Sequence, residues 1–198
     1  MNLNAEVKKQ LFKTFEILKT TLSVDQIPEI LSLTSYSVYA EFDAVKTVSS
    51  TGENEILKYF EDFVQRHNLI WVNVPVLKAA AHSFSDILRS LITFYGECTS
   101  TDEFGRQIVG LLQEWVGLNP SSLGSFYSSS ESVIALFQSL IGDCSDAVLY
   151  DGACGIGMIA NRLNPMKAIL RDINQTVVGI TALLFKMSSI DVDLQVAD

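Results

Sequence analysis

The residues best suited to chemistry lie in one short stretch, Asp151-Gly-Ala-Cys-Gly-Ile-Gly157. Its glycines lack a Cβ atom and tolerate positive φ, so a ligand can approach the bare backbone there. An apolar run, residues 147–150, precedes the acid, and a helical pattern begins at Met158. This pattern predicts a strand, a glycine turn and a helix. Open α/β sheets bind nucleotides at such a place, outside the carboxyl end of a strand.

Two kinds of ligand fit a glycine turn of this type. Gly155-Ile-Gly-Met-Ile-Ala160 satisfies the G-x-G-x-x-G/A pattern of dinucleotide sites, and Asp172 follows at the distance of a ribose-binding acid. A pyrophosphate, however, is best held by amides and a helix amino end without a carboxylate nearby, and Asp151 is such a carboxylate. S-adenosylmethionine has no phosphate and carries a sulfonium and an ammonium group. We therefore favour this methyl donor, and an NAD-binding oxidoreductase is the alternative.

Helices and strands that alternate along the chain are expected to position the glycine turn and its acids. Helical patterns are expected at 133–141, 158–163 and 176–188, and strands at 147–151, 168–172 and 193–197. This order predicts a parallel βαβαβ sheet. About five amphipathic helices are expected before it, so the fold class is α/β: a helical amino-terminal domain at 1–120 and a partial sheet domain at 121–198. Ser128 or Ser129 is expected to cap the helix that follows.

Three segments, in the same order along the chain, resemble one family. The stretch 151–157 resembles the D-P-A-C-G-T-G-G motif of adenine-specific DNA methyltransferases, especially the modification subunit of type I restriction-modification systems; Gly152 replaces proline and Ile156 replaces threonine. Residues 124–133 resemble the family's G-x-F-[FY]-T-P-x-x-[VI] segment, with Ser128 at the threonine and Ser129 at the proline. Residues 168–174 and 192–198 resemble its second and third strands, each ending in an acid.

The resemblance implies a partial Rossmann-like S-adenosylmethionine methyltransferase sheet and a set of cofactor contacts. Asp151 would face the methionine ammonium end, Asp172 the ribose and Asp198 the adenine amino group. Ser128 would hold the carboxylate end, and the glycines would admit the donor to the backbone. The full implied set of cofactor-binding residues is Ser128, Asp151, Ala153, Gly155, Gly157, Asp172, Ile173 and Asp198.

The family's target-base motif, N-P-P-[FY], is absent from the sequence, so we expect no catalytic residue and no activity from this chain alone. In the intact subunit the resemblance implies methylation of adenine N6 in DNA, with specificity and restriction subunits as partners. The alternative is a non-catalytic assembly module with a degenerate fold, which the departures at Gly152, Ile156 and Ser129 favour. The strand at 147–150 would lie at an exposed sheet edge, which predicts a homo-oligomer, a covering helix or a longer subunit.

Composition excludes several other classes of protein. The chain has 198 residues, of which 48% are hydrophobic, enough for a packed core. Its net charge of −9, with 14 basic residues, is the wrong sign for gripping DNA alone, so DNA contact would require the intact subunit. Three cysteines and two histidines suggest neither a disulfide framework nor a metal site. With no membrane span or signal peptide evident, we expect a cytoplasmic protein.

Overall fold

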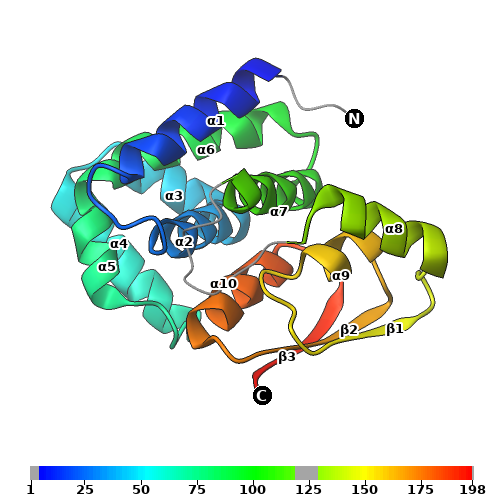
Figure 1. The fold of residues 1–198 in the computed structure, drawn as a ribbon. Coiled ribbons are helices and arrows are strands. Elements are labelled where there is room, and N and C mark those ends of the chain that lie inside the picture. The colour runs from blue at the N-terminus through cyan, green and yellow to red at the C-terminus, as the bar shows by residue number, and fades with distance from the viewer. Residues whose placement is uncertain (1–4, 119–128, 198) are drawn as a thin grey trace.

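The structure, a computed structural model, describes residues 5–118 and 129–197, in which a helical part lies above a small sheet (Figure 1). Amphipathic spacing explains the helices: α1 buries Leu11, Phe15 and Leu18, which recur at intervals of four and three. The elements of this part are α1 (Ala5–Leu18), α2 (Ile27–Ala40), α3 (Phe42–Val48), α4 (Glu53–Arg66), α5 (Val74–Ala80), the short 3-10 helix η1 (Ala81–Ser83), α6 (Phe84–Glu97) and α7 (Thr101–Leu118).

Helix α2 lies at the centre of this part and is buried on nearly all sides. Three of its hydroxyls donate to a carbonyl one turn earlier: Ser32 to Pro28, Thr34 to Ile30 and Ser37 to Thr34. The buried Ser35 Oγ has no hydrogen-bond partner within the described residues. A buried polar side chain is tolerated when it is hydrogen-bonded in this way.

The expectation of about five helices before residue 120 is wrong, since α3 and α5 are additional. Each has seven residues, which is too short to show a clear helical period. Helix α5 begins in the apolar run at 69–77, with Pro75 in its first turn. The buried Glu29 carboxylate of α2 accepts from Asn73 N at the start of α5. Burial raises the pKa of Glu29, and the hydrogen bond from the Asn73 amide opposes that rise.

A polar cluster joins the carboxyl end of α2 to α3 and α4. Glu41 accepts from Tyr59 Oη at 3.1 Å and from Arg66 Nη2 at 2.8 Å, and its Oε1 lies 2.9 Å from His67 Nε2. Tyr36 Oη lies 3.2 Å from His67 Nδ1. Burial alone would raise the pKa of the Glu41 carboxyl, but the hydrogen bonds with His67, Arg66 and Tyr59 outweigh it and lower that pKa.

The carboxyl-terminal part confirms the predicted alternation of elements. It contains α8 (Glu131–Ile141), β1 (Val148–Asp151), α9 (Met158–Leu163), β2 (Lys167–Asp172), α10 (Gln175–Lys186) and β3 (Asp191–Val196). The three strands are parallel in the order β1-β2-β3, with Val148 opposite Lys167 and Lys167 opposite Asp191. The structure is therefore mixed α/β with a parallel three-stranded sheet in the described residues, as expected from the sequence.

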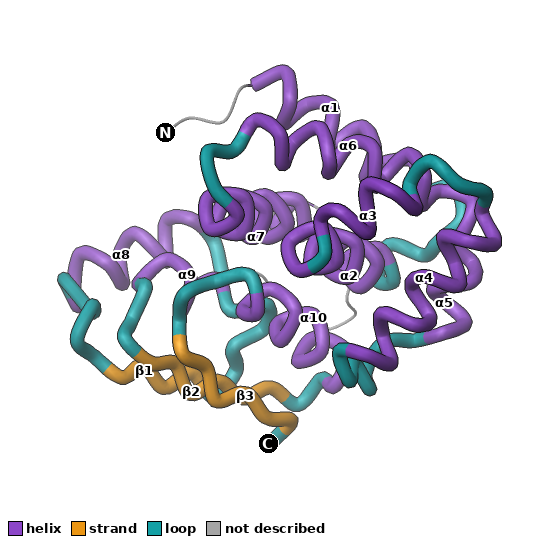
Figure 2. The backbone as a smooth tube through the Cα atoms, turned by 180° about the vertical axis from the view of Figure 1, so that it is seen from behind, coloured by secondary structure: helices purple, strands orange, loops and turns teal. Residues whose placement is uncertain are grey.

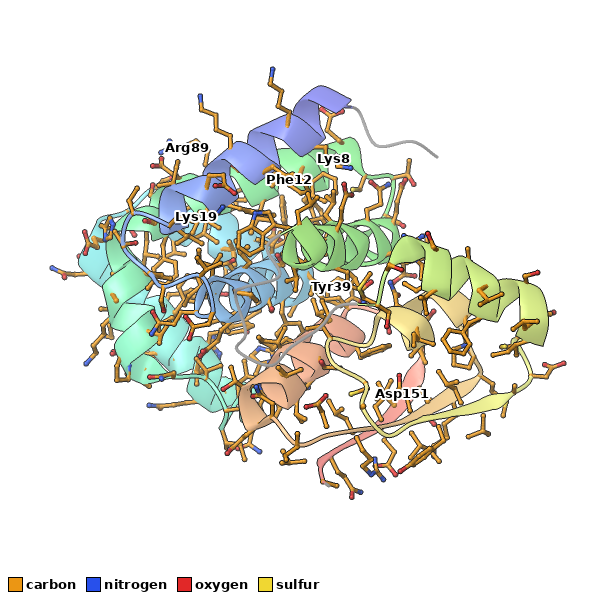
Figure 3. The ribbon with its side chains drawn as sticks, viewed as in Figure 1. Lys8, Phe12, Lys19, Tyr39, Arg89 and Asp151 are labelled. Atoms are coloured by element: carbon orange, nitrogen blue, oxygen red, sulfur yellow. The ribbon has the colours of Figure 1, made fainter. Side chains whose placement is uncertain are left out.

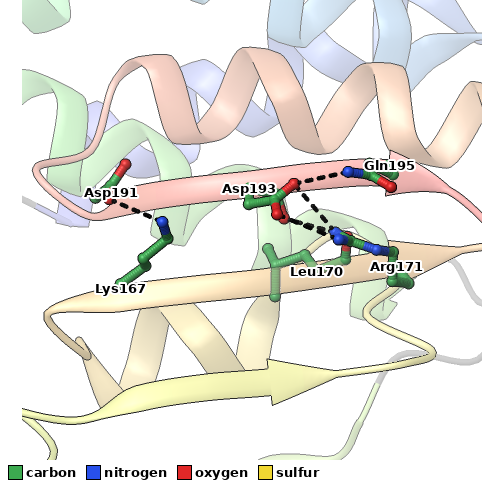
Figure 4. Close-up of polar contacts among 6 residues, drawn as sticks. All are labelled: Lys167, Leu170, Arg171, Asp191, Asp193 and Gln195. Atoms are coloured by element: carbon green, nitrogen blue, oxygen red, sulfur yellow. Dashed lines mark hydrogen bonds and ion pairs between the residues drawn. The ribbon is translucent and has the colours of Figure 1, made fainter.

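The helices lie on one face of the sheet, as both views show (Figures 1 and 2). Ala168 and Leu170 of β2 are buried on the covered face. The other face carries two ion pairs between β2 and β3: Lys167 Nζ to Asp191 Oδ2 at 3.7 Å and Arg171 Nη2 to Asp193 Oδ2 at 3.2 Å (Figure 4). Opposite charges on neighbouring strands pair with each other and give this uncovered face of the sheet a polar surface that can contact solvent.

Helix α10 packs between the sheet and the helical part. Its buried Val177, Ile180 and Leu184 belong to the same hydrophobic cluster as the helical core. Trp71 lies so close to α10 that a Cβ at Gly179 would be 2.5 Å from its Cδ1 atom, so only glycine fits there. The predicted domain boundary at residue 120 lies outside the described residues.

Candidate functional site

The glycine turn, residues 152–157, connects the end of β1 to the start of α9. Gly155 and Gly157 have φ values of +52° and +72°, in the left-handed region that L side chains rarely adopt. A Cβ atom at Gly157 would also lie 2.3 Å from Phe185 Cε2 of α10. Both conformation and space therefore require glycine at position 157.

Two predicted acids converge on this turn from neighbouring strand ends. Asp151 ends β1, in the part of the molecule below the helices (Figure 3), and its Oδ1 accepts from Ala153 N at 3.1 Å. Asp172 ends β2, and its two oxygens accept from Gly155 N at 3.0 Å and from Asn174 N at 2.9 Å. The structure thus brings the carboxylates of Asp151 and Asp172, each at the carboxyl end of its strand, to the same turn.

The thiol of Cys154 lies near the two carboxylates. Cys154 is buried, and burial, reinforced by the negative charges of Asp172 and Asp151, raises the pKa of its thiol to about 12. The thiol therefore remains neutral near pH 7 and packs as a small side chain.

The amides of the turn are largely engaged within the protein. Besides the bonds to the two acids, Cys154 N donates to Arg171 O at 2.9 Å and Gly157 N donates to Cys154 O at 2.8 Å. The turn is consequently held in one conformation by its own contacts. Amides that already donate to carboxylates and carbonyls are poorly placed to bind a pyrophosphate.

Two buried side chains from different helices fix the carbonyl groups of the turn, and sequence reasoning missed both. Thr181 of α10 donates to Gly155 O at 2.7 Å. Gln113 of α7 donates from Nε2 to Ile156 O at 3.1 Å and accepts from Asn161 Nδ2 of α9 at 2.9 Å. The available signal for Gln113 was a polar residue on the apolar side of the helical pattern, directly after Leu111 and Leu112 and two residues before Trp115.

Ile156 is buried between the turn and the helical part. Its side chain is 1% exposed and shares a small apolar cavity with Leu112, Trp115 and Val116 of α7. An isoleucine here adds apolar burial between the turn and the helical part, which a threonine would supply less well. The turn is therefore built into the helical core.

The structure describes the placement of two of the four remaining predicted site residues. Ala153 is exposed on the turn, and Ile173, directly after Asp172, is 72% exposed. Ser128 and Asp198 lie outside the described residues. Ala197 N donates to Asp172 O at 3.1 Å, so the end of β3 lies beside the end of β2.

The predicted helix cap is wrong by one or two positions. Ser130, rather than Ser128 or Ser129, is the N-cap of α8, and its Oγ accepts from Val133 N at 3.3 Å. Neighbouring serines have the same capping chemistry, so the sequence alone does not distinguish them.

Within the described residues, no group of three or more histidine, cysteine, aspartate or glutamate side chains could hold a metal ion. None of the helices in this part of the chain combines the length and the hydropathy that a membrane span requires. No protein-family model, curated protein or solved structure matches the chain.

Proposed function

We propose that the glycine turn binds S-adenosylmethionine, and that the chain is part of a type I restriction-modification methyltransferase subunit with a partial Rossmann-like donor-binding sheet. The observation that carries this proposal is the pair Asp151 and Asp172. The two carboxylates end adjacent parallel strands and both hydrogen-bond to the same turn.

The charges of this donor match the site. Its sulfonium and ammonium groups are cationic, and carboxylates that are partly shielded from water attract cations more strongly than exposed ones. Asp151 and Asp172 are half-buried, so they remain accessible. Each oxygen of Asp172 accepts one amide and retains a lone pair for a ribose hydroxyl. The exposed Ile173 offers an apolar contact to the adenine ring.

NAD fits the same turn less well. Its pyrophosphate would lie beside two carboxylates, and like charges at close range are unfavourable. The amides of Ala153, Cys154, Gly155 and Gly157 already have acceptors. These contacts support the methyl donor over the dinucleotide.

In the intact subunit the reaction is transfer of a methyl group to adenine N6. The amino nitrogen attacks the methyl carbon as the carbon–sulfur bond breaks, the sulfur becomes a neutral thioether, and the nitrogen loses a proton. The part of the site described here supplies donor positioning. The sequence has no N-P-P-[FY] segment, so the proposed role of this chain is confined to donor contacts. DNA, a specificity subunit and a restriction subunit are the proposed partners, in the cytoplasm.

A second candidate function, assembly without donor binding, is favoured by a separate observation. Helix α8 exposes Val133, Leu136, Phe137, Leu140 and Ile141. Contiguous apolar surface of this kind marks interaction sites.

A thermal-shift comparison tests the proposed ligand. A ligand that binds only the folded state stabilises it by about 2.7 kcal/mol at a hundredfold excess over Kd. We expect S-adenosylmethionine to raise the melting temperature and NAD to leave it unchanged at the same concentration. A larger shift with NAD would reverse the assignment, and no shift with either ligand would favour assembly alone.

A further inference from the structure

Thr181 of α10 contacts the glycine turn through its hydroxyl group. The side chain is fully buried, and its Oγ1 donates to Gly155 O at 2.7 Å. A hydroxyl has a single hydrogen, and Thr181 Oγ1 also lies 2.8 Å from Val177 O, so two carbonyl oxygens share that donor. Val177 belongs to the same helix, whereas Gly155 is 26 residues away in the sequence. The bond to Gly155 is therefore the one that ties α10 to the turn.

Gly155 is held at both ends by these neighbours. Its amide donates to Asp172 Oδ2 at 3.0 Å, and its carbonyl accepts from Thr181. Within the described residues the carbonyl has one further donor, the Cys154 thiol at 3.4 Å, and a thiol is a weak donor. Loss of the Thr181 hydroxyl would thus leave the bond to Asp172 as the main anchor of Gly155.

The same helix also reaches the second oxygen of Asp172. Asp172 Oδ1 accepts from Asn174 N at 2.9 Å, and the Asn174 side chain caps α10 by accepting from Val177 N at 3.2 Å. These contacts form a closed loop that runs from Asp172 through Gly155 and Thr181 to α10 and returns through Asn174. Hydrogen bonds in such a network support one another.

We propose that Thr181 is a positioning residue for the methyl donor. Its hydroxyl fixes Gly155, and the Gly155 amide in turn holds the Asp172 carboxylate in the orientation that accepts the ribose hydroxyls. Because Thr181 is fully buried, it acts through Gly155 and Asp172 and not by contact with the donor. A site held in its binding geometry binds more tightly than one that must be ordered by the ligand. The inference rests on the proposed function, since a positioning role requires that the donor binds at this turn.

Thr34 of α2 provides a matched control. It is fully buried like Thr181, and within the described residues its hydroxyl donates only to carbonyls of its own helix, Ile30 O at 2.8 Å and Leu31 O at 3.1 Å. Thr34→Val therefore removes a buried hydrogen bond inside one helix. Thr181→Val removes the same kind of bond and, in addition, the bond to Gly155.

Calorimetric titration of the full chain with S-adenosylmethionine compares these variants, after circular dichroism has shown that each is folded. We expect Thr181→Val to bind the donor at least about fivefold more weakly than the wild type, and Thr34→Val to stay within about twofold. Thr181→Ser keeps the hydroxyl and should also stay within about twofold. Packing alone predicts the opposite order at position 181, because valine fills the site and serine leaves room for a methyl group.

Hydrogen exchange of the Gly155 amide, followed by NMR without the donor, tests the link from Thr181 to Asp172 separately. We expect this amide to exchange at least about fivefold faster in Thr181→Val, while the amides of β2 keep their wild-type rates. Thr34→Val should leave the Gly155 rate unchanged. If Thr181→Val does not fold, Thr181→Ala and Thr34→Ala replace the valine pair in both measurements.

The possible failures can be told apart. Equal donor affinity in the wild type and Thr181→Val would overturn the inference and leave donor binding in place. Weaker binding by Thr181→Ser than by Thr181→Val, or an equal loss in Thr34→Val, would reduce Thr181 to a packing role. An unchanged Gly155 exchange rate in Thr181→Val would break the link to Asp172. No binding by the wild type would refute the proposed function, and the positioning role with it.

Discussion

Gln113 offers the sharpest test of how the glycine turn is held. Gln113→Leu preserves the approximate volume of the side chain and removes its hydrogen bonds to Ile156 O and Asn161 Nδ2. Ile156 is 1% exposed, so its carbonyl would lose its partner in a site with little access to water. An unsatisfied buried acceptor costs about 1–3 kcal/mol. Asn161 is half-buried and can recover part of its loss from solvent.

Gln107, on the same helix, provides a matched control. Its Nε2 donates to Glu103 at 2.8 Å, and its Oε1 is buried without a partner within the described residues. Gln107→Leu loses the hydrogen bond to Glu103 one turn away and removes a buried oxygen that has no partner within the described residues. We therefore expect the free energy of unfolding to change by no more than about 0.5 kcal/mol.

Urea unfolding followed by circular dichroism measures both variants. We expect Gln113→Leu to lower the free energy of unfolding by about 1–3 kcal/mol and the melting temperature by about 2–4 °C per kcal/mol. If Gln113→Leu is no less stable than Gln107→Leu, the helical part does not hold the glycine turn through this side chain.

Three further predictions concern stability and reactivity. Gly157→Ala should lower the free energy of unfolding by at least about 1–2 kcal/mol, because position 157 has positive φ and a Cβ there would clash with Phe185. Gly110→Ala, in open space on α7, should leave that free energy unchanged or raise it by up to about 1 kcal/mol. Urea unfolding measures both variants, and equal effects would contradict the turn geometry. The pKa of Glu41 lies below its ordinary value of 4.5, so the stability that its ionised carboxylate contributes is fully present above pH 4.5 and is lost as the pH falls through the pKa of the folded state. Glu41→Gln should therefore make the free energy of unfolding less sensitive to acid, and an unchanged dependence of that free energy on pH would count against the cluster. Cys154, with a thiol pKa of about 12, should react with iodoacetamide at about pH 8 only after unfolding, as mass spectrometry would show; rapid native alkylation would refute its burial.

The carboxyl-terminal elements were predictable because local signals agreed there. Apolar runs, turn residues and helical stripes alternate, and no predicted bound of a strand or helix differs from the structure by more than two residues. The convergence of Asp151 and Asp172 also followed from sequence, since the carboxyl ends of adjacent parallel strands lie at one edge of a sheet.

Features that depend on tertiary contact were not predictable. Gln113 and Thr181 have no local signal for reaching a carbonyl that is distant in sequence. Likewise, the spacing of α8 predicts an apolar face but not whether another element covers it, and in the structure that face is exposed.

Calorimetric titration with S-adenosylmethionine tests most directly whether the strand-end carboxylates hold a cationic donor. Asp172→Asn keeps a similar shape and removes the charge, whereas Asp191→Asn makes the same change at the opposite end of the strands. We predict one donor per chain, at least about tenfold weaker binding in Asp172→Asn and unchanged binding in Asp191→Asn. No heat at millimolar donor, or equal affinity in both variants, would contradict donor binding at this turn.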